Sequence, residues 1–188
     1  MLLVHAGNRI DLANRSVARF PSSQVPAVRD RVGRLLDSLR PSGVVSAAAA
    51  GADLIVLEEA IRRGLDVHVI MPIAPDEFVA ESVVDAGSEW VDRFDGVLRH
   101  ISTHPRCSVT QGEGTAGDAW YLAANDELLD RAAVIAGSDI IVALAVRPPE
   151  GENPPSVTDD FVARAGRSGL LVMCIDPRPG STASVTVG

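Results

Sequence analysis

Two short segments carry residues whose types and spacing could bind an anionic ligand. The first is Gly7, Asn8 and Arg9, which follow the apolar run that begins the chain. The guanidinium fork of Arg9 suits a phosphate or a carboxylate, and the structural alternative is a surface ion pair with Asp11. The second segment, residues 46–53, follows another apolar run and consists of small residues that let a ligand approach the backbone closely.

The segment 46–53 leads into a stretch with helical periodicity and is typical of a strand-to-helix turn. Gly51 can adopt the backbone angles that such a turn needs. The first amide groups of the following helix have no partner within the helix, so they predict an anion site. The spacing matches neither a Walker loop nor GxGxxG, and a turn packed tightly with alanines is the alternative.

Short apolar runs alternate with helical stretches along the chain and must position these loops. Strands are predicted at residues 2–4, 44–45, 67–71, 107–110, 140–146 and 170–175. Helices are predicted at 25–39, 53–63, 88–101, 119–136 and 158–167, and a short one within 75–87. Residues 111–118 and 147–156, which are rich in glycine and proline respectively, are expected to be loops.

This alternation predicts βαβ units and a Rossmann-like, doubly wound α/β fold. The sheet should be mostly parallel, with five to seven strands and helices on both faces. Ligands of such sheets bind beyond the carboxyl ends of the strands, where Pro72 follows the third predicted strand. Residues 1–177 are expected to form one domain, and residues 178–188 a flexible tail or linker.

Composition excludes several classes of function. The chain has 188 residues and a formal net charge of −8, and all 17 of its basic residues are arginines. A P-loop lysine and a Schiff-base lysine are therefore excluded, and the acidic balance argues against nucleic-acid binding. The two cysteines allow no zinc cluster. No apolar run could span a bilayer and no signal peptide is evident, so we expect a cytoplasmic protein without membrane partners.

Several motifs together resemble the SLOG superfamily, which includes Lonely Guy phosphoribohydrolases, DNA-processing protein A and nucleotide-sensing domains of bacterial defence and signalling proteins. The similarity covers roughly residues 1–177. The matching stretches are residues 7–11, 19–21, 44–46, 50–53, 57–60, 64–72, 76–78, 82–83 and 90–94, and then Asp118, Tyr121 and Asn125. The first loop departs from the family, because residues 47–50 replace a more glycine-rich run.

The resemblance implies a Rossmann-like domain that binds a nucleotide or a nucleotide-derived ligand, such as an NAD-derived molecule or a cyclic nucleotide. It implies that the pocket is lined by Gly7, Asn8, Arg9, Ser46, Ala47, Gly51, Ala52 and Asp53. Thr158 and Asp159 match a second family loop, although Ser156 and Val157 replace its two glycines and Asn8 stands where a histidine is common. Tyr121 is a further candidate, because a phenol beside Asp118 and Asn125 could contact a base.

Three functions stay open at this point. The first is a ligand sensor without a cofactor, which regulates a homo-oligomer or an associated effector. The second is an enzyme that cleaves an N-glycosidic bond, with Glu77 or Glu81 as a possible carboxylate. That enzyme is disfavoured because Phe161 stands where the Lonely Guy hydrolases have a glutamate. The third is a scaffold whose pocket has degenerated.

Overall fold

The structure, a computed structural model, describes all residues except 14, 115–117, 150–155, 181–182 and 188. One seven-stranded sheet has the order β4-β3-β2-β1-β5-β6-β7. Six strands are parallel, and the edge strand β7 runs antiparallel to β6. The strands are β1 (Leu2–Gly7), β2 (Gly43–Ser46), β3 (Asp66–Ile73), β4 (Ser108–Gly114), β5 (Ile141–Val146), β6 (Leu171–Ile175) and β7 (Ala183–Val187).

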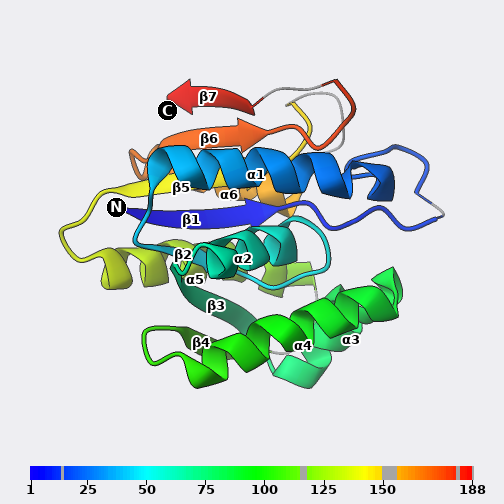
Figure 1. The fold of residues 1–188 in the computed structure, drawn as a ribbon, viewed down its shortest axis with the longest axis horizontal. Coiled ribbons are helices and arrows are strands. Elements are labelled where there is room, and N and C mark those ends of the chain that lie inside the picture. Colours follow the sequence, from blue (N-terminus) through cyan, green and yellow to red (C-terminus); the bar gives the residue numbers. More distant parts are fainter. Residues whose placement is uncertain (14, 115–117, 150–155, 181–182, 188) are drawn as a thin grey trace.

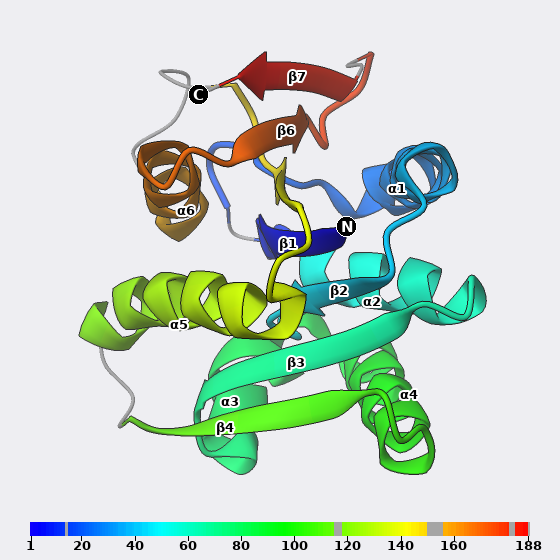
Figure 2. The same cartoon turned by 90° about the vertical axis from the view of Figure 1, so that its left-hand side faces the viewer.

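Helices cover both faces of the sheet, as Figure 2 shows. Their bounds are α1 (Val25–Leu39), α2 (Ala52–Arg62), α3 (Pro75–Ser82), α4 (Ser88–Thr103), α5 (Asp118–Ala136) and α6 (Val157–Arg167), with 3-10 turns at Ser22–Gln24 and Val84–Ala86. The first four helices share one apolar core with Leu3 and Val44, whereas α5 and α6 share a second core with Leu2 and Val4. Neighbouring residues of β1 thus point to opposite cores, and the predicted doubly wound fold is confirmed.

The strand order reverses at β1, which pairs with β2 on one side and with β5 on the other (Figure 1). Val4 is level with Val45 of β2 and with Ala143 of β5. In open α/β sheets the connections that leave such a reversal diverge to opposite faces and leave a crevice between them. The segments that follow β1 and β5 therefore form the predicted edge for a ligand.

The predicted ends of β3 and β4 were wrong. Residues 111–114 were expected in a loop but extend β4, and β3 continues through Pro72 to Ile73 with a shift in register. A Cβ atom on Gly112 would lie 2.3 Å from the carbonyl oxygen of Pro72, so glycine is what lets the two backbones approach here. Residues 183–187, expected in a flexible tail, pair with β6 instead.

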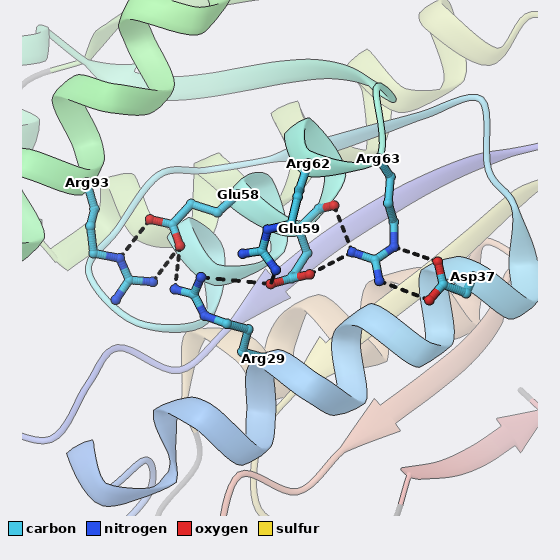
Figure 3. A network of polar contacts seen from close by, with 7 residues as sticks. All are labelled: Arg29, Asp37, Glu58, Glu59, Arg62, Arg63 and Arg93. Carbon is cyan, nitrogen blue, oxygen red and sulfur yellow. Dashed lines mark hydrogen bonds and ion pairs between the residues drawn. The ribbon is translucent and has the colours of Figure 1, made fainter.

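A network of ion pairs joins α1, α2 and α4 on one face of the sheet (Figure 3). Glu58 accepts hydrogen bonds from arginines of both neighbouring helices, and Glu59 is only 2% exposed. The network consists of Arg29, Asp37, Glu58, Glu59, Arg62, Arg63 and Arg93. In the described part of the chain, no helix has both the length and the apolar character needed to cross a membrane.

Candidate functional site

A cavity of about 210 Å³ lies at the carboxyl ends of the strands, beside the reversal of strand order. It is bounded by the segment after β1, the start of α2, the end of β3 and the start of α6. The predicted residues that line it are Gly7, Asn8, Arg9, Ala47, Asp53, Pro72 and Thr158. The sheet therefore brings residues that are far apart in the sequence to one place.

Ser46, Gly51, Ala52 and Asp159 are not among the described residues that line this cavity. Ser46 is fully buried, and its hydroxyl lies 3.0 Å from Nδ1 of His5. Gly51 and Ala52 are buried under the segment that follows β1. Asp159 lies at the start of α6, where it serves the helix itself. The side chain of Tyr121 lies outside the described residues.

The start of α2 is closed by the protein's own backbone. The amide of Ala52 donates to the carbonyl of Asn8 at 3.2 Å, and the amide of Ile10 donates to the carbonyl of Ala50 at 3.0 Å. Gly51 has a φ of 128°, and a Cβ atom there would lie 2.5 Å from the nitrogen of Ile10. The amide of Ala52 is therefore not free to bind an anion, because the carbonyl of Asn8 already accepts its hydrogen bond.

Gly7 is needed for packing as well as for its place at the cavity. A Cβ atom on Gly7 would lie 2.3 Å from Cβ of Ala52 and 3.0 Å from Nε2 of His5. Glycine therefore lets β1 approach the first turn of α2 closely. This contact sets the position of the neighbouring Asp53 carboxyl relative to the end of β1.

Asp53 is a buried carboxyl group that lines the cavity, with 5% of its surface exposed. Its Oδ2 accepts a hydrogen bond from the amide of Ala49 at 3.3 Å, whereas Oδ1 has no hydrogen-bond partner within the described protein. Burial raises the pKa of Asp53 to about 7, against smaller opposing effects of the Ala49 and Gly7 amides and of Arg9. A carboxyl with so perturbed a pKa in a cavity is typical of functional sites.

His5 lies directly behind this carboxyl. Its Nδ1 is 3.5 Å from Oδ1 of Asp53, and its side chain is fully buried. Burial lowers the pKa of His5 to about 3, so the imidazole is neutral at physiological pH. The close contact between the two side chains is therefore not an ion pair in neutral solution.

Two asparagines complete the inner part of the site. Oδ1 of Asn8 is buried without a hydrogen-bond partner among the described residues. The amide nitrogen of Asn125 donates to the carbonyl of Val157 and to Asp160, both at 2.9 Å. Because both amide hydrogens of Asn125 are used, its remaining polar atom is the acceptor Oδ1. The inner end of the cavity is therefore rich in hydrogen-bond acceptors.

Arginines stand at the more exposed end of the same cavity. Arg9 donates to the carbonyl of Glu81 at 3.1 Å and forms an ion pair with Asp85. The expected alternative pairing of Arg9 with Asp11 was wrong, because Arg15 pairs with Asp11 at 3.0 Å. Arg19 also lines the cavity. Arg15 and Arg19 were missed as site residues, although the spacing of Asp11 and Arg15 already indicated a local pair.

Asp11 holds the loop that carries these arginines. Its Oδ2 accepts hydrogen bonds from the amides of Arg19 and Phe20, each at 2.9 Å. Its own amide donates to the carbonyl of Phe20 at 2.9 Å, and the Phe20 ring is fully buried. The loop is thus closed at its base and anchored in the core.

The second predicted loop is held by a capping box. Asp159 accepts a hydrogen bond from the amide of Ser156 at 2.7 Å, and the Ser156 hydroxyl accepts from the amide of Asp159. Asp159 also pairs with Arg147 at 2.7 Å. Thr158 lies between these residues, is 5% exposed and lines the cavity. Phe161 is fully buried in the core.

Among the described residues no group of histidine, cysteine and acidic side chains could hold a metal ion. Glu77 and Glu81 do not line the cavity with their side chains. Among the described residues that line the cavity, Asp53 therefore supplies the ionisable carboxyl group. This group could donate a proton or accept hydrogen bonds from a ligand.

Comparison with known proteins supports the fold. No protein family matches the sequence, and no curated protein does so either. Among solved structures, the chain is similar to the X-ray structure of TM1055, a target of the Northeast Structural Genomics Consortium. The TM-score is 0.50 and the identity 17%, over 91% of this chain and 71% of that chain. At this identity the likeness shows a Rossmann-like α/β fold.

Proposed function

We propose that this chain is a SLOG-like domain that binds a nucleotide or a nucleotide-derived small molecule in the cavity beside β1. In this proposal, occupancy of the cavity regulates a homo-oligomer or an associated effector. The observation that carries the proposal is that one cavity is lined both by arginines and by Asn8 and Asp53, each of which has a buried oxygen without a hydrogen-bond partner among the described residues. Buried polar atoms without partners are rare in folded proteins, and a bound ligand is one way to satisfy them.

The charge distribution supports an anionic ligand at the arginines. The whole chain has a formal charge of −8, which repels an anion at long range. Arg9, Arg15 and Arg19 come from one short loop and bring three guanidinium groups to the cavity. A guanidinium has five N–H donors, so Arg9 and Arg15 can bind a phosphate while each keeps contact with its carboxylate partner.

An N-glycosidic hydrolase is the second candidate, and Asp53 is the observation that favours it. A carboxyl with a pKa of about 7 can protonate a leaving base at neutral pH. The residue at the position of the family's glutamate is the buried Phe161, so a second carboxylate would have to come from elsewhere. We therefore place ligand binding first.

The test is a titration of the purified protein with AMP, CMP, NAD and cyclic AMP. We expect at least one of these to raise the stability, by about 2.7 kcal/mol when its concentration is about 100 times Kd. Arg9→Ala should weaken that binding about tenfold or more, since charge-assisted contacts to phosphate are lost. Arg34→Ala is the matched control, because Arg34 lies exposed on α1 and pairs with Asp30 there.

The outcomes separate the three functions. Stabilisation without release of free base supports the sensor. Release of adenine or cytosine, measured by chromatography, supports the hydrolase. If none of the four compounds binds, the proposal fails and the scaffold gains support.

A further inference from the structure

The polarity of the cavity gives the orientation of its ligand. This inference rests on the proposed function. We infer that the cavity binds the sugar of a nucleotide at its inner end, with the ribose hydroxyls toward Asn8 and Asp53. The phosphate then lies at Arg9, Arg15 and Arg19. The cavity should therefore select ribonucleotides over deoxyribonucleotides.

The atoms of Asn8 and Asp53 that are buried without a partner at the inner end are acceptor oxygens. Asn8 and Asp53 each have a buried oxygen without a partner, and the amide hydrogens of Asn125 are both used within the protein. The amide of Ala52, at the start of α2, is bonded to the carbonyl of Asn8. A phosphate offers mainly acceptor oxygens and would be repelled here. Hydroxyl groups can donate to these oxygens, and a ribose has two of them side by side.

The arginines lie where the cavity is more exposed. Side-chain exposure is 28% for Arg9 and 38% for Arg15, compared with 7% for the Asp53 side chain. The hydrogen bonds from Arg9 to Glu81 and Asp85 hold its guanidinium at this end. Cations at the mouth and acceptors at the inner end match a molecule with an anion at one end and hydroxyls at the other.

The size of the cavity fits a part of a nucleotide. Its volume of about 210 Å³ lies below the ~300 Å³ at which pockets for drug-sized ligands begin. The cavity therefore has room for one part of a nucleotide, and the orientation inferred above assigns this room to the sugar. A pentose phosphate without a base should consequently retain a measurable share of the affinity.

The charge state of Asp53 provides an independent readout. Two titratable or charged groups face this carboxyl, namely the neutral His5 on β1 and Arg9 in the loop after β1. The ionised form of Asp53 accepts hydrogen bonds from hydroxyls better than the protonated form does. Preference for ribose should therefore increase from pH 6 to pH 8. The phosphate is the same in ribo and deoxyribo compounds, so its own titration cancels in their ratio.

The experiment measures Kd by calorimetry for AMP, 2′-deoxy-AMP, 3′-deoxy-AMP, ribose 5-phosphate and 2-deoxyribose 5-phosphate. Loss of a hydroxyl bonded to a charged group should weaken binding about tenfold or more. Asp53→Asn should reduce the ratio of deoxy to ribo Kd values to about twofold. Asp92→Asn, the same substitution at an exposed position on α4, should leave this ratio unchanged.

Failure of the inference and failure of the proposed function give different results. Equal binding of AMP and both deoxy compounds would overturn the orientation while the nucleotide site stands. A ratio that survives in the Asp53→Asn protein would overturn the assignment to Asp53. No binding of any nucleotide or sugar phosphate would overturn both. The comparison between ligands needs only the unmodified protein, so it does not depend on the folding of a variant.

Discussion

Replacing Asp53 by asparagine should change how the stability of the protein depends on pH. Burial raises the pKa of Asp53 from 3.8 to about 7 in the folded state. The contribution of this group to stability is therefore fully present below pH 3.8 and is lost as the pH rises through about 7. Each pH unit in this window corresponds to about 1.36 kcal/mol. Between pH 4.5 and 6.5, the unmodified protein should lose roughly 2 to 3 kcal/mol relative to Asp53→Asn.

The pKa shift of His5 has the opposite effect on the pH dependence of stability, and it hides the effect of Asp53 in the unmodified protein. The folded pKa of His5, about 3, lies below the ordinary 6.5, so its contribution is present above pH 6.5 and is lost as the pH falls toward 3. Between about pH 4 and 6.5, folding adds one proton to Asp53 and removes one from His5. The two effects nearly cancel, and in the Asp53→Asn protein the acid sensitivity due to His5 should no longer be compensated.

Urea unfolding at pH 4.5, 5.5 and 6.5 measures the difference in unfolding free energy between the two proteins. Other titrating groups are common to both and drop out of this difference. Asp92→Asn, at an exposed position on α4, is the control for the replacement of a carboxylate by an amide. The reasoning would be refuted if the difference in unfolding free energy for Asp53→Asn did not change with pH, or changed in the opposite direction. Either result would mean that folding does not favour the protonated carboxyl.

Two further predictions concern stability. Gly112→Ala should destabilise the fold by about 1–3 kcal/mol in urea unfolding, because the new methyl group would overlap the carbonyl of Pro72. Gly96→Ala, in an open position on α4, is the control and should stabilise the fold by up to about 1 kcal/mol. Similar effects of the two substitutions on the unfolding free energy would contradict the steric argument. Glu59→Ala should cost about 1–3 kcal/mol, because the charge-assisted hydrogen bond that the buried Glu59 accepts from Arg63 is lost, whereas Asp30→Ala, in an exposed pair, should cost less than about 1 kcal/mol. Equal losses of unfolding free energy in Glu59→Ala and Asp30→Ala would show that the burial of Glu59 does not determine how much its ion pairs stabilise the fold.

The fold could be predicted because its signals are local and repeated. The apolar run at 140–146 indicated a strand covered on both faces, and its residues do lie in both cores, one shared with α5 and α6 and the other with the first four helices. Helix α1 has the predicted bounds because its apolar residues recur at helical spacing up to Leu39. The edge strand at 183–187 gave a weaker signal, since a short strand with one neighbour needs no long apolar run.

The site could be predicted only in part. The sequence indicated which loops reach the ligand edge, and Asn8, Arg9 and Asp53 do meet there. Which amides stay free depends on how residues 8–10 cross the start of α2, and this contact joins segments about forty residues apart. The pairing of Arg9 with Asp85 has the same origin, because it depends on how the segment after α3 folds back. No local pattern carries that information.

The antiparallel direction of β7 has a practical consequence for anyone who attaches this domain to something else. Val187 pairs with Leu171, the first residue of β6, and Met1 precedes the first residue of β1. Both ends of the described chain therefore emerge at the pole of the sheet opposite the cavity (Figure 1). A fused fluorophore, or a tether to a sensor chip at either end, would leave the mouth of the cavity accessible to small molecules in solution.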